Sequence, residues 1–117
     1  MDEIAKSFRA TRIDLLKFYA DPTEQRSFAN DTHYDDYESE FFCWWFDDFH
    51  PGSELFKRAF VANEIETLTA FSAVWGRESA LLGEVARPID DLLSTSGWSS
   101  VVEAARHALF RFTGGTA

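Results

Sequence analysis

Hydrophobic positions recur at close to the helical period of about 3.6 residues through most of the chain. The spacing predicts an amphipathic helix over 3–20 that stops at Asp21-Pro22. Its apolar stripe consists of Ile4, Phe8, Leu15 or Leu16, and Phe18 or Tyr19, with Lys6, Arg9, Arg12 and Lys17 largely off it.

The next two stretches give weaker signals. Residues 21–33 are rich in turn formers and have no clear period, which predicts a loop with a short helical turn after Pro22. Residues 34–49 contain the run FFCWWF, which fits either a helix or a buried strand by periodicity alone. Because the chain offers few other β-branched runs to pair with, we favour a helix for this stretch.

The second half of the chain carries clearer boundaries. His50-Pro51-Gly52 ends the preceding element, and Ser53 is placed to cap a short helix that carries Phe56 and Phe60. Asn63 followed by Glu66 predicts the start of a helix over about 63–75, which stops near Gly76.

Two further helices follow. Pro88 opens a short helix with Asp90 and Asp91 in its first turn, and Ser96-Gly97 breaks it. Ser99 or Ser100 caps a last helix that runs to Phe112, ahead of a frayed tail at 113–117. The sequence therefore predicts one all-α domain over 1–117, a compact bundle of five or six helices.

Charge and aromatic residues are concentrated in one segment. The chain has 20 acidic and 11 basic residues, a net charge of −9, and residues 27–56 contain eight acids and no Lys or Arg. This segment thus contributes −8, and the rest contributes 11 − 12 = −1. It also holds ten of the 19 aromatic residues. Such a surface repels nucleic acid and anionic membranes and favours basic partners.

The sequence gives no sign of a membrane helix, a secretory signal or an internal disulfide. No stretch approaches the roughly 18 apolar residues that a membrane helix requires, and the N-terminus lacks the apolar region of a secretory signal. Cys43 is the one cysteine, which excludes an internal disulfide. We expect a cytoplasmic protein in which Cys43 is a packed, inert thiol within FFCWWF.

The acidic segment offers two catalytic interpretations. His33, Asp35 and Asp36 form one His/acid group, and Asp47, Asp48 and His50 form another. A helix between them would separate His33 from His50 by about 25 Å, which argues against one shared ion. Carboxylate pairs for acid–base work are expected by chance in so acidic a segment. We assign no catalytic residue, metal or cofactor.

The acids and the aromatic residues of this segment both suit a protein-binding surface. Acids attract and orient a basic surface, and exposed aromatic side chains supply contact area at the centre of an interface. The alternative is that most of these aromatics form the core, as expected for Trp75 and Trp98. Trp44 and Trp45 are adjacent and cannot face the same way on a helix. The candidate partner-binding residues are Tyr34, Asp35, Asp36, Tyr37, Glu38, Glu40, Trp44, Trp45, Asp47 and Asp48.

Several short patterns resemble a known class of proteins. They are DDFHP at 47–51, F-x-x-x-F at 56–60, E-x-x-x-L-x-x-F at 64–71, PIDDLL at 88–93 and W-x-x-V-x-x-A-A at 98–105. Over residues 41–112 the chain resembles small acidic helical immunity proteins of bacterial contact-dependent growth inhibition.

The resemblance implies a non-catalytic inhibitor that binds a cognate basic toxin domain, often a nuclease, and covers its active site. It transfers no individual residue. Two other hypotheses stay open at this point: a small metal-dependent or acid–base enzyme built on the two His/acid groups, and an acidic DNA mimic that regulates a basic protein.

Overall fold

The computed structural model describes residues 2–31, 37–83 and 87–112, and confirms the all-α class. The described residues contain no strand, and they form seven helices rather than five or six. The tail expected at 113–117 lies outside them. The helices are α1 (Glu3–Tyr19), α2 (Pro22–Asp31), α3 (Tyr37–Phe46), α4 (Glu54–Ala59), α5 (Ala62–Leu82), α6 (Ile89–Leu93) and α7 (Ser96–Phe112).

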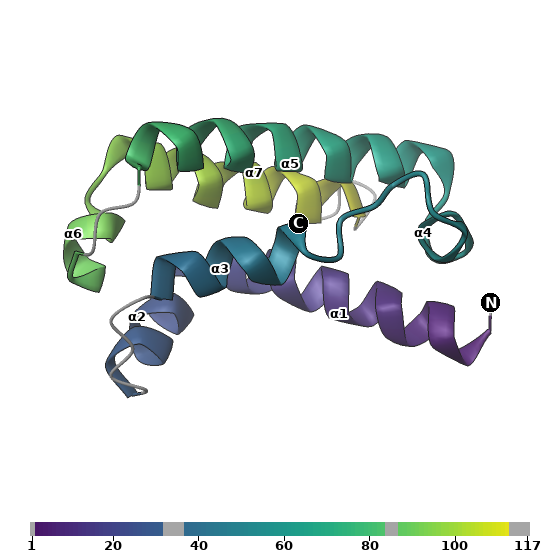
Figure 1. The fold of residues 1–117 in the computed structure, drawn as a ribbon, viewed down its shortest axis with the longest axis horizontal. Coiled ribbons are helices and arrows are strands. Elements are labelled where there is room, and N and C mark those ends of the chain that lie inside the picture. Colours follow the sequence, from purple (N-terminus) through teal and green to yellow (C-terminus); the bar gives the residue numbers. More distant parts are fainter. Residues whose placement is uncertain (1, 32–36, 84–86, 113–117) are drawn as a thin grey trace.

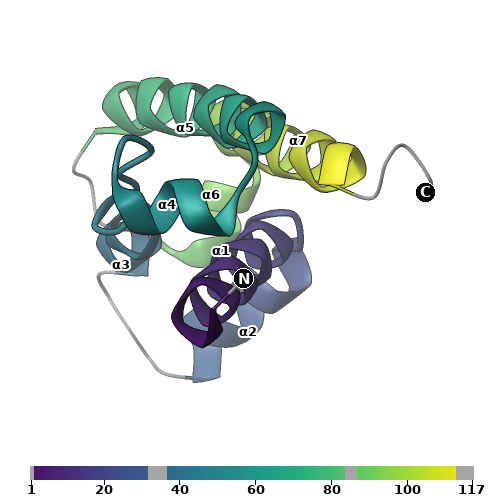
Figure 2. The ribbon, with the colours of Figure 1, turned by 90° about the vertical axis from the view of Figure 1, so that its right-hand side faces the viewer.

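The helices pack in two layers. The long helices α5 and α7 lie side by side and antiparallel in one layer, and α1, α2 and α3 form the other (Figure 1). The short helices α4 and α6 lie at opposite ends of the molecule, and Figure 2 looks at it from the α4 end. The principal extents are 40 × 26 × 24 Å.

Aromatic side chains fill the space between the layers. Trp98 of α7 is 1% exposed and packs edge-on against Trp75 of α5, with ring centroids 5.1 Å apart. This confirms the expectation that both belong to the core. Trp45 of α3 is fully buried, and its indole Nε1–H donates to the Ser72 hydroxyl at 2.7 Å. Large rings that bury 150–250 Å² each allow a chain of this size to form one such core.

The segment 21–33 was expected to be a loop, and this was wrong for most of it: Pro22–Asp31 is α2. Gln25, which has no exposed surface, explains the difference. Its side-chain amide donates to the carbonyls of Phe18 and Tyr19 at 2.9 and 3.0 Å, and its Oε1 accepts from Trp98 Nε1 at 2.8 Å. The helix is thus held by tertiary bonds that leave no periodic signal.

Helix boundaries follow their capping residues. Ser53 caps α4 as predicted, because its hydroxyl accepts from the Phe56 amide at 3.2 Å. The predicted start of α5 at Asn63 and Glu66 was shifted: Val61 is the N-cap residue, and its amide donates to the Glu64 carboxylate at 3.0 Å. This helix also continues through Gly76, where Phe46 packs against the backbone, and ends at Gly83.

The last two helices begin elsewhere than predicted. Pro88 precedes α6 as its N-cap instead of occupying its first position. Ser96-Gly97 was predicted to end α6 and Ser99 or Ser100 to cap α7, but α6 ends at Leu93 and α7 already begins at Ser96, where the Thr95 hydroxyl accepts from the Trp98 amide at 3.1 Å. A Cβ at Gly97 would stand 2.9 Å from the Glu78 carboxylate, so a larger residue here would require the flexible Glu78 side chain to move.

A partly buried ion pair ties α1 to α4 and α5. Arg9 donates to both carboxylate oxygens of Glu64 at 2.8 Å and to the carbonyl of Ala59 at 3.0 Å. The hydrogen bonds from Arg9 hold the pKa of Glu64 below its ordinary value of 4.5. A bidentate pair of this kind is stronger than an exposed single contact.

We expect Gln25→Leu to lower the free energy of unfolding by about 3 kcal/mol, because three buried polar groups lose their partner. Urea denaturation measures this change. Ser27→Ala, at an exposed position of the same helix, should stay within about 0.5 kcal/mol of the parent chain. A Gln25→Leu loss no larger than that of Ser27→Ala would contradict the role given to Gln25.

We expect Glu64→Gln to lower the free energy of unfolding by about 1 kcal/mol at neutral pH. Because folding lowers the pKa of Glu64, its stabilisation is present above about pH 4.5 and is lost as the pH falls through the folded value. The difference between parent and variant should therefore shrink in acid, as urea denaturation at neutral pH and at about pH 3 will show. Glu66→Gln, at an exposed position of α5, is the control; a Glu64→Gln difference that is constant with pH would refute the assignment.

Candidate functional site

Helix α3 lies within the segment where acids and aromatics coincide, and one of its faces is the core. Tyr37, Phe41 and Trp45, each four residues apart, are 3%, 0% and 0% exposed. Phe41 stacks on Trp98 with ring centroids 5.9 Å apart. This face therefore fixes the rotation of α3 about its own axis.

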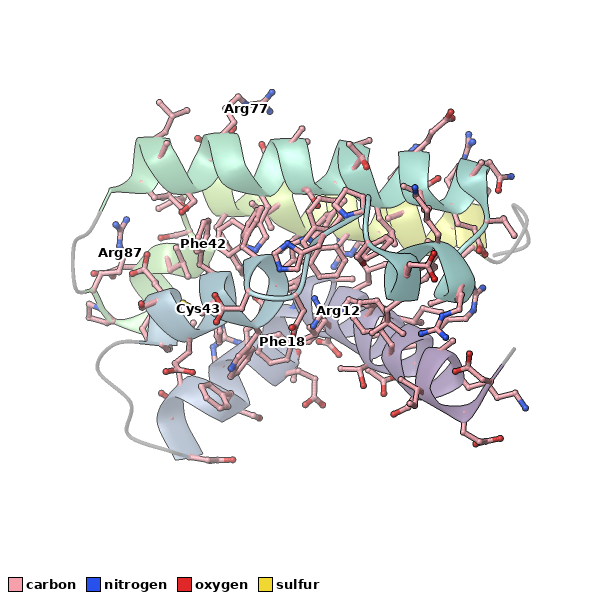
Figure 3. All side chains as sticks on the ribbon, turned by 45° about the vertical axis from the view of Figure 1, so that its right-hand side comes forward. Arg12, Phe18, Phe42, Cys43, Arg77 and Arg87 are labelled. Atoms are coloured by element: carbon pink, nitrogen blue, oxygen red, sulfur yellow. The ribbon has the colours of Figure 1, made fainter. Side chains whose placement is uncertain are left out.

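The opposite face of α3 carries a polar stripe. Ser39 and Asp47 are exposed, and Glu40 and Cys43 are half-buried. We call these four residues the outer stripe of α3; positions four and seven apart share one face of a helix. Cys43 is thus less deeply packed than the sequence indicated, since FFCWWF turns this residue away from the core (Figure 3).

Half-buried aromatic rings border the outer stripe on both sides. On the α1 side, Trp44 packs edge-on against Phe28 and Phe18, with centroid distances of 4.9 and 5.5 Å. On the α5 side, Phe42 and Phe46 stack with centroids 4.3 Å apart. Figure 3 shows Phe18 and Phe42 on these two opposite sides of α3. The stripe and its borders form a surface of acids flanked by aromatic carbon.

Arg12 of α1 holds the C-terminal end of α3. Its guanidinium is 3% exposed and donates to the carbonyls of Trp44 and Trp45, both at 3.0 Å. It lies over the Trp45 ring, 5.2 Å from the centroid, and 3.6 Å from the carboxylate of Asp48. Burial lowers the pKa of Arg12 and the Asp48 charge raises it, and a guanidinium stays protonated in either case.

Each of the four carbonyls at the C-terminal end of α3 accepts a hydrogen bond. The last four carbonyls of a helix lack partners within it, and in α3 these belong to residues 43–46. The amides of Asp47 and Phe49 donate to the outer two, Cys43 and Phe46, at 3.0 and 3.3 Å, and Arg12 serves the two between. A cation at the negative end of the helix dipole is also favourable.

The N-terminal end of α3 is tied to the segment that precedes α6. Glu38 forms an ion pair with Arg87 at 3.0 Å, with side chains only 21% and 16% exposed. The Tyr37 hydroxyl donates to the carbonyl of Arg87 at 2.8 Å, and Arg87 donates to the carbonyl of Leu82 at 2.9 Å. Burial, together with the charge of Glu38, raises the pKa of Tyr37, so its hydroxyl remains a donor.

The structure separates the candidate residues into three groups. Tyr34, Asp35 and Asp36 lie outside the described residues. Tyr37 and Trp45 are core residues and Glu38 is half-buried in its ion pair, so these three side chains maintain the fold. Glu40, Trp44, Asp47 and Asp48 remain at the surface around the outer stripe, and Trp44 is the more exposed of the two adjacent indoles.

The sequence pattern did not indicate two features of this surface, the rings of Phe42 and Phe46 and the buried position of Arg12. Phe42 and Phe46 border the stripe, although no period marked them as different from their neighbours. Arg12 was placed off the apolar stripe of the first helix, and this was wrong: it shares a buried face with Leu16 and Tyr19. Its spacing of four and seven residues from these two was the available signal.

The ion pairs of the described residues explain where the negative surplus lies. They involve nine of the 11 cations of the chain, each with an acid of its own. Asp47 and Glu54 form no ion pair within the part of the chain described here, and both are exposed. Asp47 therefore keeps an uncompensated negative charge at the end of α3, as do acids at exposed positions of other helices, among them Glu24 of α2 and Glu66 of α5.

The features needed for metal chemistry are not assembled in the described residues. His33 lies outside them, and His50 is exposed, with its ring Nε2 3.0 Å from the carbonyl of Asp47. Within 2–31, 37–83 and 87–112, no three His, Cys, Asp or Glu side chains are grouped as metal ligands would be. In the same ranges no helix has the length and apolarity to cross a bilayer.

Comparison with known proteins gives no family for this chain: no family model, no curated protein and no solved structure matches it.

We expect Arg12→Ala to lower the free energy of unfolding by about 3 kcal/mol or more, because it leaves two buried carbonyls unpaired. Arg12→Lys should recover only part of this loss, since an ammonium lacks the planar fork that reaches both carbonyls. Urea denaturation tests both variants. Lys17→Ala, at an exposed position of α1, should have little effect. An Arg12→Lys variant as stable as the parent chain would rule out the bidentate role.

Proposed function

We propose that this protein is a non-catalytic inhibitor of the immunity type, which binds a cognate basic toxin domain in the cytoplasm and covers its active site. The observation that carries the proposal is the outer stripe of α3, where the exposed Asp47 and the half-buried Glu40 are flanked on both sides by half-buried aromatic rings. Acids of this kind steer and orient a basic partner, and aromatic carbon stabilises the contact at its centre.

Rigidity of α3 supports the proposal. The helix is held by Arg12 at one end and by Arg87 at the other, and its inner face is locked into the core. A surface that is ordered before binding loses little conformational entropy on association. Such preorganisation suits an inhibitor that must bind tightly to a single partner.

The charge distribution supports the same proposal. Because most cations are engaged in ion pairs, a basic partner finds no competing positive charge next to Asp47, and its own Lys or Arg side chains relieve repulsion among the acids. Association should be fast and should slow as salt screens charges over roughly 8 Å. A toxin that acts on nucleic acid is basic for its own function and fits this requirement.

The experiment is capture of a partner from the native lysate at low and high salt, followed by identification by mass spectrometry. The proposal is supported if the partner is a basic toxin domain whose activity is blocked by one equivalent of this protein. Recovery of a basic DNA-binding protein without toxin activity, or of no stoichiometric partner, would overturn it.

The surface is tested with the double variant Glu40→Gln, Asp47→Asn. We expect the association rate constant with the captured toxin domain, measured by surface plasmon resonance, to fall roughly threefold to tenfold. The matched control is Glu24→Gln, Glu66→Gln, which removes the same charge at exposed positions of α2 and α5. Equal effects of the two double variants would show that net charge, and not the outer stripe, governs binding.

A further inference from the structure

A cleft of about 390 Å³ lies where α4 ends and α5 begins, away from α3. Its floor is apolar: Ala59 and Phe60 are buried beneath it. Its walls include Val61, which is 63% exposed, and Ile65, which is half-buried. Clefts that hold small ligands begin at about 300 Å³ and are mainly apolar with a few polar groups. This one has the size and the lining of such a site.

One wall of the cleft is electrically neutral. Arg9 and Glu64 form the bidentate ion pair described above, and the Arg9 guanidinium lies over the Phe60 ring, 5.2 Å from its centroid. The hydrogen bonds between the two groups raise the pKa of Arg9 and lower that of Glu64. This wall of the cleft therefore carries no net charge, and the ion pair holds the planar Arg9 guanidinium in a fixed position.

The rim of the cleft is positive. Arg58 is 3.3 Å from the carboxylate of Asp2, and both side chains are about half exposed. Lys57 is exposed and forms no ion pair within the described residues. Arg111 likewise has no ion pair in the part of the chain described, and it adjoins Phe112, whose ring packs against Phe60 with centroids 6.0 Å apart.

The two cations without an ion pair therefore lie at the same end of the molecule, where α4, the start of α5 and the end of α7 meet (Figure 2). Lys57 also has an exposed acid nearby, because Glu54 begins α4 one turn before it, so the excess positive charge at the rim is small. A positive rim above an apolar floor is complementary to a ligand that carries one negative charge on an apolar body.

We propose that this cleft binds a small monocarboxylate with an apolar body. The carboxylate contacts Lys57 and Arg58, and the body covers Phe60, Val61 and Ile65. A single charge is favoured because Glu64 and Asp2 lie beside the rim and the net charge of the chain repels a polyanion. The apolar body is required because ion pairs at an exposed rim contribute little alone.

The test is a titration of the full chain followed by amide ¹H–¹⁵N NMR, with three probes. Hexanoate carries both features, hexan-1-ol lacks the charge and acetate lacks the body. We expect hexanoate to cause saturable shifts confined to the amides of residues 57–65, and expect the other two probes to bind at least about fivefold more weakly. The absence of saturable shifts in this segment, or equal binding of hexan-1-ol or acetate, would overturn the proposal.

Variants test the rim and the wall separately. Lys57→Gln should weaken hexanoate binding about fivefold, whereas Lys17→Gln, which removes the same charge from an exposed position of α1, should leave it unchanged. Val61→Ser should also weaken binding, and it keeps the start of α5 intact because serine is a preferred N-cap residue. If Lys17→Gln weakens binding as much as Lys57→Gln does, only net charge is involved and the cleft is not the site.

Discussion

The guanidinium of Arg12, bonded to two carbonyls at the end of α3, is the interaction on which the packing of α3 against α1 depends. A helix as apolar as α3 has to be surrounded by other elements, but its terminal carbonyls also require donors. Arg12 donates to two of these carbonyls from an almost fully buried position, and its positive charge also suits the negative end of the helix dipole, which a neutral amide does not. Arginine supplies a fork of N–H groups on a long stem, and its stacking over Trp45 places it between α1 and α3.

A second consequence concerns charge. Nine of the 11 cations are held in ion pairs within the described residues, so they do not neutralise the exposed Asp47 at the end of α3. The cleft beside α4 has the opposite character, because Lys57 has no such partner in the described residues. The molecule therefore presents two chemically different surfaces on one small scaffold, and they involve different helices.

The sequence was sufficient where structure is local. Spacing and neighbouring residues were enough to predict the Ser53 cap, the core positions of Trp75 and Trp98 and the helical state of FFCWWF. The sequence was insufficient where contacts between distant residues determine whether a segment is helical. Gln25 turns a turn-rich segment into α2 through bonds to Trp98, 73 positions away. Gly76 lies inside α5, although a glycine usually predicts a helix end, and the side chain nearest to it is that of Phe46 in α3, which is distant in the sequence.

The candidate surface shows the same limit. Composition located the acids and aromatics, but a list of residue types does not state which ring turns inward. Tyr37 and Trp45 form the core, while Trp44, one residue away, borders the surface. The rotation of α3 decides between these roles, and that rotation is set by packing against Trp98 and by Arg12, neither of which is near α3 in the sequence.

Cys43 gives the outer stripe a practical property. It is the one thiol in the chain, and it lies between the acids of the stripe and not in the core. A fluorophore or spin label coupled to it would stand at the centre of the proposed interface without any engineered cysteine. The protein thus carries a native attachment point, and a label placed there responds to the occupancy of one helix face.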